Sequence, residues 1–213
     1  MKRLYFIAIC SVCACLIGIG IWCAITKPQR QYRFKPTTEK FEVNADDITY
    51  GVDTAPLTII MFTTFNCRHC RKFLSEDLPI IASHYIDNGR ARFVLKPIEL
   101  SENQDMLSAL QLAICMNRNG EADDIIELLL TETSTIYTDD FRILISDIIN
   151  GNPELAECLT ADDFSTIKKN NSDYSTLGSK LTPIFVIGQH FYVGRRRVEQ
   201  FMEVIDYELS IIK

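Results

Sequence analysis

The feature that most constrains the fold of this chain is a pair of cysteines, Cys67 and Cys70, separated by two residues. The pair follows Leu57–Thr64, a short apolar run rich in β-forming residues, which predicts a buried strand. A helix should begin near Cys67, where unpaired backbone N–H groups stabilise a thiolate. Two sulfurs at this spacing can close a small ring, as dithiol–disulfide chemistry requires. A lone motif of this kind is a weak signal, so the rest of the chain has to support it.

The segments after this motif first continue as helix and strand and then become wholly helical. The helix that begins near Cys67 should end at about Ile86, and residues 90–96 alternate in polarity as a strand does. Residues 101–178 then change character, because five helical segments follow one another without a strand signal between them. This block of helices interrupts an otherwise alternating pattern.

After that block the pattern returns to strand. Residues 183–187 and 190–194 predict two strands joined by a turn, and residues 197–211 predict a last amphipathic helix. The order of elements is therefore strand, cysteine-bearing helix, strand, helical block, hairpin and helix. This order predicts an α/β protein with a thioredoxin fold that carries an inserted all-helical lobe.

The chain starts with an almost unbroken apolar segment, residues 4–26, which predicts an N-terminal transmembrane helix. Its 23 residues can span a bilayer and exceed the apolar core of a usual signal peptide. No small-x-small cleavage site ends it, so we favour an uncleaved anchor over a removed signal peptide, and a lipoprotein site at residues 12–15 has weak support. More basic residues follow the segment than precede it, against the positive-inside tendency. We nevertheless expect the rest of the chain to be exported, because dithiol chemistry suits an exported domain.

Residues 27–46 are polar and charged without a sustained period, which predicts a tether between the anchor and the folded domain. No internal repeat or low-complexity tract is present. The predicted domains are, in chain order, an anchor or signal segment at residues 1–26, a polar tether at 27–46, a thioredoxin-like domain at 47–100 and 179–213, and an inserted helical domain at 101–178.

Charge and cysteine usage narrow the class of function. Two of the 22 basic residues precede the predicted anchor, which leaves 20 against 28 acidic residues and a net charge of −8. An acidic domain of this kind argues against nucleic-acid binding. Four of the eight cysteines lie in the apolar anchor, where they would pack as small apolar side chains. An oxidising compartment would pair the other four as two disulfides: Cys67, Cys70, Cys115 and Cys158.

Four stretches carry the residues and the order of a known family: residues 53–60, 65–70, 96–97 and 182–188. Through them the chain resembles the DsbA-like family of exported bacterial thiol–disulfide oxidoreductases, over roughly residues 47–212. Within that family it looks most like the membrane-tethered or secreted type with a second cysteine pair in the helical lobe. The resemblance implies the same thioredoxin fold with a helical insertion.

Cys67 is the predicted nucleophile and Cys70 its resolving partner. Basic side chains within residues 68–72 should add to the stabilisation of the Cys67 thiolate, and a stabilised thiolate is a good leaving group. His69 lies between the cysteines, as it does in the strongly oxidising members that the resemblance implies, and should act on the thiolate by charge or hydrogen bond. The alternatives are a structural disulfide, a zinc site that lacks a second ligand pair, and an exposed His69 without effect.

Thr182 and Pro183 match the family's cis-proline loop, which faces the active-site disulfide. In that geometry the backbone of Thr182 can pair with an extended substrate chain, whereas the alternative is an ordinary trans proline that opens a strand. The resemblance also implies a disulfide between Cys115 and Cys158 within the helical lobe. Two buried free thiols, packed as small apolar side chains, are the rival interpretation.

One position departs from the family pattern. Many members carry a buried acidic residue six positions before the first active-site cysteine, where this chain has Met61. Met61 should therefore be an ordinary core residue. Lys96, often the neighbour of that acid, should have a different partner.

Together these inferences predict a membrane-tethered enzyme that donates disulfides through Cys67 and Cys70. The resemblance implies reduced exported proteins as substrates and reoxidation by a DsbB-like membrane partner, without a metal or organic cofactor. We expect a monomer held in the bacterial inner membrane by residues 4–26, with its catalytic domain in the periplasm. The alternatives are a periplasmic reductase or isomerase of the same fold, or a non-enzymatic module that binds thiols, metal or unfolded chains. Residues 27–46 are too few for an isomerase's dimerisation domain, which favours the oxidase.

Overall fold

The computed structural model describes residues 35–118, 120–161 and 164–212. The predicted transmembrane anchor, residues 4–26, lies outside the described residues. Among the residues that are described, no helix is both long enough and apolar enough to cross a membrane.

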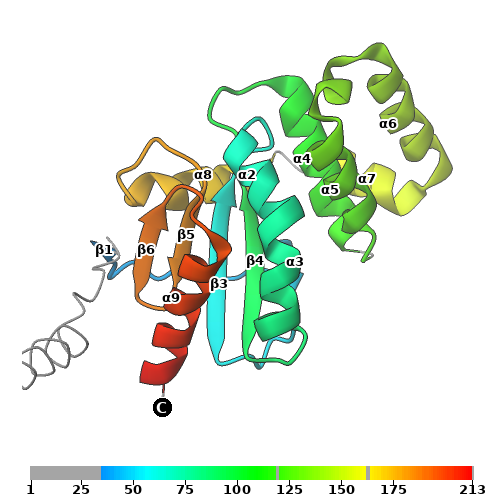
Figure 1. Cartoon of the computed structure of the whole chain (residues 1–213). Helices are drawn as coiled ribbons and strands as arrows, with labels where there is room; N and C mark the ends of the chain where they lie inside the picture. Colours follow the sequence, from blue (N-terminus) through cyan, green and yellow to red (C-terminus); the bar gives the residue numbers. More distant parts are fainter. Residues whose placement is uncertain (1–34, 119, 162–163, 213) are drawn as a thin grey trace, which may run out of the picture. The chain divides into compact units, whose positions relative to one another are not determined.

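A mixed β-sheet forms the centre of the described chain (Figure 1). Its strands are β1 (Lys35–Pro36), β2 (Ile48–Tyr50), β3 (Leu57–Thr63), β4 (Ala91–Pro97), β5 (Ile184–Ile187) and β6 (His190–Val193). Within the described residues their order across the sheet is β1-β6-β5-β3-β4-β2. Strands β3 and β4 pair in parallel, and the other neighbours pair antiparallel. The parallel pair brings the carboxyl ends of β3 and β4 to one edge, where the segments that follow them meet.

The central strands β3 and β4 are buried on both faces because most of their side chains are apolar. Their bounds agree within one residue with the strands predicted at Leu57–Thr64 and at residues 90–96. Met61 is fully buried in β3 and pairs in register with Leu95. It is therefore an ordinary core residue, as expected.

A helix is present over the range predicted from Cys67 to Ile86, but two π-helical turns interrupt it. It consists of α2 (Arg68–Lys72), the π-helical turn η1 (Phe73–Asp77), α3 (Leu78–Ile81) and the second π-helical turn η2 (Ala82–Ile86). Pro79 lies in the first turn of α3. A proline inside a helix has no N–H for the preceding turn, and the wider η1 turn just before it accommodates that loss.

This helix and α9 (Val198–Ile211) cover one face of the sheet and stand in front of it in Figure 1. Phe73 joins the two layers, because its ring centroid lies 4.4 Å from that of Phe185 on β5 and 5.0 Å from that of Phe201 on α9. All three rings are buried. This aromatic cluster fixes the cysteine-bearing helix against the sheet.

The opposite face of the sheet is covered in part by the described end of the predicted tether. Phe41 packs edge-on against Phe62 with ring centroids 5.4 Å apart, and Val43 packs against the same apolar cluster. Upstream of them, β1 pairs with β6 at the edge of the sheet. The boundary at residue 46 stays a prediction. The described residues 35–46 nevertheless belong to the packed structure, because two apolar side chains two positions apart fall on the same side of an extended segment.

The segment between β4 and β5 is helical, as expected. Its helices are α4 (Gln104–Asn117), α5 (Ala122–Thr131), the short 3₁₀ helix η3 (Thr133–Tyr137), α6 (Asp139–Gly151), α7 (Pro153–Ala161) and α8 (Ser165–Thr176). Thr138 caps α6, because its Oγ1 accepts the backbone N–H of Phe141 at 3.3 Å. Cys115 in α4 and Cys158 in α7 are joined by a disulfide with Cα atoms 5.9 Å apart.

The last helix of that segment, α8, packs against the sheet (Figure 1). Tyr174 of α8 and Leu177, its C-cap residue, are buried in the same apolar cluster as Phe62 and Val94 of the central strands. By sequence α8 belongs to the inserted domain predicted at residues 101–178, a boundary that stays a prediction. By packing it covers the second face of the sheet beside the tether segment.

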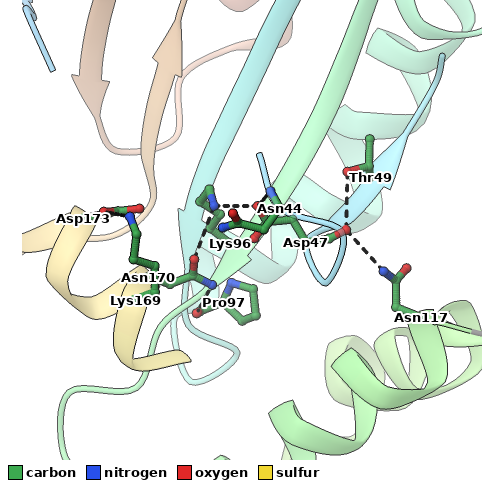
Figure 2. A network of polar contacts seen from close by, with 9 residues as sticks. All are labelled: Asn44, Asp47, Thr49, Lys96, Pro97, Asn117, Lys169, Asn170 and Asp173. Atoms are coloured by element: carbon green, nitrogen blue, oxygen red, sulfur yellow. Dashed lines mark hydrogen bonds and ion pairs between the residues drawn. The ribbon is translucent and has the colours of Figure 1, made fainter. Parts of the chain in front are cut away.

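A buried polar network links the sheet to two helices (Figure 2). The Nζ of Lys96, on β4, lies 2.6 Å from the Oδ2 of Asp47 and donates to the Oδ1 of Asn170 on α8 at 3.4 Å. The Nδ2 of Asn170 donates to the carbonyl of Pro97 at 3.1 Å, and the Nδ2 of Asn117 on α4 donates to the carbonyl of Asp47 at 3.2 Å. Lys96 thus has Asp47 as its acidic partner, in place of the acid that Met61 replaces.

Candidate active site

The two cysteines of the motif lie where β3 passes into α2. Cys67 is the N-cap residue of α2, with extended backbone angles of φ −84° and ψ 112°, and its Sγ accepts the backbone N–H of Cys70 at 3.4 Å. The Nη1 of Arg71 donates to the carbonyl of Phe65 at 2.6 Å, which holds the turn before the helix. Cys67 is therefore presented at a helix N-terminus, at the edge where β3 and β4 end together.

The surroundings of Cys67 favour its thiolate. The hydrogen bond from the Cys70 side chain is the largest influence, and the Thr182 side chain and the backbone N–H groups of Cys70 and His69 act in the same direction. Partial burial opposes them, yet together they lower the pKa of Cys67 from 9.0 to about 5. At neutral pH the reduced protein therefore carries a thiolate at this position.

Cys70 lies in the opposite situation. Its side chain is fully buried, and burial, followed by the hydrogen bond to Cys67, raises the pKa of the Cys70 thiol far above its ordinary value. Cys70 therefore keeps its proton and donates it to the Cys67 sulfur in a hydrogen bond. Both cysteines are free thiols in this structure. The pair thus consists of a partly accessible thiolate and a buried thiol.

The side chain of His69 is exposed on the first turn of α2. Its backbone N–H contributes to the stabilisation of the Cys67 thiolate. Any residue except proline would supply the same N–H group. The role predicted for the imidazole ring therefore stays a prediction.

The loop before β5 brings Thr182 and Pro183 to the cysteines. The Thr182–Pro183 peptide bond is cis, and the Cys67 thiol group lies 3.4 Å from the carbonyl oxygen of Thr182. This contact joins residues 115 positions apart in the chain. Pro183 is buried while Thr182 is half-buried, so the peptide group between them borders the accessible side of Cys67.

Two tyrosines near the cysteines have no signal in the sequence. The hydroxyl of Tyr174, on α8, donates to the carbonyl of Leu181 at 3.3 Å, one residue before Thr182. The hydroxyl of Tyr137, on η3, exchanges hydrogen bonds with the Asn66 side-chain amide at 3.1 and 3.2 Å, one residue before Cys67. Neither tyrosine belongs to a motif, so only the folded chain reveals these contacts.

The arrangement of these groups suits thiol–disulfide exchange. An accessible thiolate can attack or leave, and a buried thiol within hydrogen-bond distance can close a ring with it. Cys115 and Cys158, already joined in the helical segment, are separate from this pair. Across the described residues, no group of three or more His, Cys, Asp or Glu side chains is placed to bind a metal ion.

Comparison with known proteins gives relatives of the same kind. The chain is 23% identical over 172 residues to a provisionally named protein-disulfide oxidoreductase of Rickettsia prowazekii, and this match covers 76% of the chain and 61% of the relative. The chain thus spans less than two thirds of that protein's length. A Rickettsia felis protein with the same provisional name is 23% identical over 195 residues, which cover 87% of this chain and 68% of the relative.

Two solved structures share the fold. The α-DsbA1 protein of Wolbachia pipientis superposes with a TM-score of 0.63 at 21% identity, over 79% of this chain and 93% of the other. BdbD of Bacillus subtilis superposes with a TM-score of 0.64 at 15% identity, over 83% of this chain and 99% of the other. The family model described as thioredoxin matches residues 43–207. The chain therefore belongs to the thioredoxin family, with the helical insertion of its DsbA-like members.

Proposed function

We propose that this protein is an exported thiol–disulfide oxidoreductase that donates the disulfide of Cys67 and Cys70 to cysteines of other exported proteins. The observation that carries the proposal is the contrast between the two sulfurs. The pKa of Cys67 is lowered to about 5, while burial keeps the Cys70 thiol protonated. A thiolate of such low basicity leaves readily, so Cys67 is easily displaced from a mixed disulfide with a substrate, and the reduced form of the pair is stabilised.

The proposed reaction transfers two electrons from the substrate to the protein. A substrate thiolate attacks the Sγ of Cys67 in the oxidised protein, the Cys67–Cys70 bond breaks, and the Cys70 sulfur leaves and takes up a proton. A second substrate thiolate then attacks the substrate sulfur of this mixed disulfide, and Cys67 leaves as a thiolate. The substrate gains one disulfide, and the protein holds one thiolate and one thiol.

In the proposed exchange, the groups around Cys67 stabilise its thiolate and bind the substrate chain. The N–H groups at the start of α2 and the Thr182 side chain stabilise the leaving Cys67 thiolate. The backbone of Thr182, beside Cys67, can pair with an extended substrate chain. We include in the proposal a single N-terminal anchor in the bacterial inner membrane, a periplasmic catalytic domain, a monomeric state, and reoxidation by a DsbB-like membrane protein.

The reduction potential of the Cys67–Cys70 pair tests the proposal. The full chain is equilibrated with mixtures of reduced and oxidised glutathione, and the redox state of these two residues is read by alkylation and peptide mass spectrometry. We expect a value between about −80 and −200 mV, the range of disulfide donors. A value near about −270 mV, as in thioredoxin, would assign the protein to the exported reductants instead.

A further inference from the structure

We infer that Tyr174 is a positioning residue of the active site, whose hydroxyl holds the carbonyl of Leu181 and thereby places Thr182 against Cys67. The inference rests on the proposed function only in taking Cys67 as the reactive thiol. It concerns a residue of α8, outside every motif of the sequence. Its consequence is that one hydrogen bond from the inserted segment holds the loop that carries Thr182.

The contact is built from a buried and well-packed side chain. Tyr174 is 2% exposed, its ring centroid lies 6.2 Å from that of Phe62, and its hydroxyl donates to the carbonyl of Leu181 at 3.3 Å. Leu181 itself is 67% exposed, so its side chain does little to hold the loop. The loop is therefore held chiefly through its backbone, and Tyr174 holds the carbonyl next to Thr182.

The rest of the loop backbone has separate partners. The N–H of Leu181 donates to the Oγ of Ser179 at 3.2 Å, and the carbonyl of Pro183 accepts the N–H of Gly194 at 2.8 Å. Ser179 lies on the same loop, whereas Gly194 follows β6. Tyr174 thus fixes the start of the loop to a helix, and Gly194 fixes its end to the sheet.

The helix that carries Tyr174 is itself held firmly at the end of β4. Asn170 contacts Lys96 and the carbonyl of Pro97, as Figure 2 shows. Asn171 donates to the carbonyl of Glu99 at 2.7 Å and accepts the N–H of Glu99 at 3.1 Å. Asn170 and Tyr174 are four residues apart and so lie on the same face of α8. The Tyr174 side chain therefore extends from a helix that hydrogen bonds hold against the end of β4.

The position of Thr182 determines which of its groups contact the Cys67 sulfur. Its side chain stabilises the Cys67 thiolate, whereas its carbonyl oxygen accepts a hydrogen bond from the protonated Cys67 thiol at 3.4 Å. Hydrogen bonds weaken steeply when their geometry is lost. If the start of the loop is released, the thiolate loses the Thr182 side chain as a donor, and its pKa should rise.

The variant Tyr174→Phe tests the inference, because it keeps the ring against Phe62 and removes only the hydroxyl. The alkylation rate of Cys67 is measured against pH in the reduced full chain, with the Cys67 peptide followed by mass spectrometry. We expect the pKa of Cys67 to rise by about 0.5 units, which lowers its thiolate fraction about threefold at low pH. Because no substrate is used, the result does not depend on the direction of the proposed redox reaction.

Tyr85→Phe is the matched control. Tyr85 is also 2% exposed, and its hydroxyl also donates to a backbone carbonyl, that of Met202 at 3.4 Å. It lies in η2, at the end of the cysteine-bearing helix opposite Cys67. Because this hydroxyl also hydrogen-bonds the Asp206 carboxylate, its loss should lower stability at least as much as Tyr174→Phe does, and it should leave the pKa of Cys67 unchanged.

A double-mutant cycle with Thr182→Val separates positioning from a direct effect. If Tyr174 acts through Thr182, Tyr174→Phe should shift the pKa of Cys67 much less when Thr182 is already valine. A folded Tyr174→Phe protein with an unchanged or lowered pKa of Cys67, or strictly additive shifts, would overturn the inference. Should that variant fail to fold, a crystal structure of the unaltered protein decides the matter. A Tyr174 hydroxyl beyond hydrogen-bond distance of the Leu181 carbonyl would overturn the inference equally.

Discussion

At the residue scale, the chemistry of this site comes from placing two identical side chains in different surroundings. Cys67 lies at the open end of a helix and receives several hydrogen bonds, whereas Cys70, three residues later, is buried in the core. The first environment stabilises a negative charge and the second one excludes it. Neither an accessible pair nor a buried pair would combine a stabilised thiolate with a buried, protonated thiol.

The lowered pKa of Cys67 makes the stability of the reduced protein depend on pH. The thiol is ionised above about pH 5 in the folded protein but only above about pH 9 in the unfolded chain. Between these values the unfolded state binds more protons, so the free energy of unfolding rises with pH. Urea denaturation of the reduced protein from about pH 5 to about pH 8 should show this rise.

The variant Cys67→Ser is the reference for that measurement, since it keeps the other titrating groups and removes this one. The interval ends near pH 8 because Cys70, whose pKa is raised in the folded state, would lower stability at more alkaline pH. The same pH dependence in both proteins would contradict a lowered pKa of Cys67.

At the scale of elements, helices α4 and α7 are tied together by the disulfide between Cys115 and Cys158. Beside it, the Nη1 of Arg118 lies 3.1 Å from the Cys158 sulfur, and the Nε of Arg118 donates to the carboxylate of Asp46 at 2.7 Å. The bond therefore stands next to an ion pair with the segment that leads into β2. The disulfide thus links two helices of the lobe covalently, and the ion pair links the lobe to the segment that leads into β2.

Removing this disulfide should weaken the lobe measurably. The bond closes a loop across a sequence separation of 43 residues, for which chain entropy predicts about 4 kcal/mol of stabilisation. The double variant Cys115→Ser/Cys158→Ser should lose about that free energy of unfolding in urea without reductant. Hydrogen exchange should locate the greatest loss in α4 and α7, while a denaturation midpoint equal to that of the parent would refute a stabilising role.

At the scale of the whole molecule, a buried charge pair joins the sheet to the helical segment. Lys96 and Asp47 pair with no exposed side-chain surface, and Asn170 and Asn117 extend the contact to α8 and α4 (Figure 2). Because the pair is surrounded by protein, each charge depends on the other for compensation. Loss of this charge pair should therefore destabilise both the sheet and the helical segment.

Lys96→Met should lower the free energy of unfolding by about 3–5 kcal/mol, because it leaves Asp47 buried without its countercharge. Arg90→Met is the control, since Arg90 pairs with Asp206 at the surface with side chains 50% and 59% exposed. An exposed pair of that kind contributes about 1 kcal/mol or less. Denaturation in urea compares the two variants, and equal losses would show that burial of the pair has no energetic consequence.

The second variant Asp47→Asn/Lys96→Met removes both charges and should recover part of the loss. If it is no more stable than Lys96→Met, the cost comes from packing of the lysine stem and not from an uncompensated carboxylate. Comparison of the two variants thus shows whether the loss of stability comes from the uncompensated charge or from packing.

Much of the fold could be predicted because its signals are local. Neighbouring residues form the apolar run of β3, and neighbouring residues also cap and end the helices. The element order and most bounds therefore follow from the sequence. The π-helical turns around Pro79 and the burial of Phe41 could not be predicted in the same way. They depend on what each segment packs against, and a polar stretch with two apolar side chains gives little sign of it.

The sequence by itself determined which two cysteines form the closely spaced pair and that Cys67 stands at a helix N-terminus, because a strand, two spaced cysteines and a helix are consecutive in the chain. The family resemblance already implied that Thr182 lies beside Cys67, whereas only the tertiary structure decided that Tyr174 binds the carbonyl of Leu181 and that Asp47 pairs with Lys96. The physical reason is that hydrogen bonds act over a few ångströms, while these partners, Tyr174 and Leu181 excepted, are dozens of residues apart. Strand register and helix packing bring them within that distance, and a local pattern encodes neither.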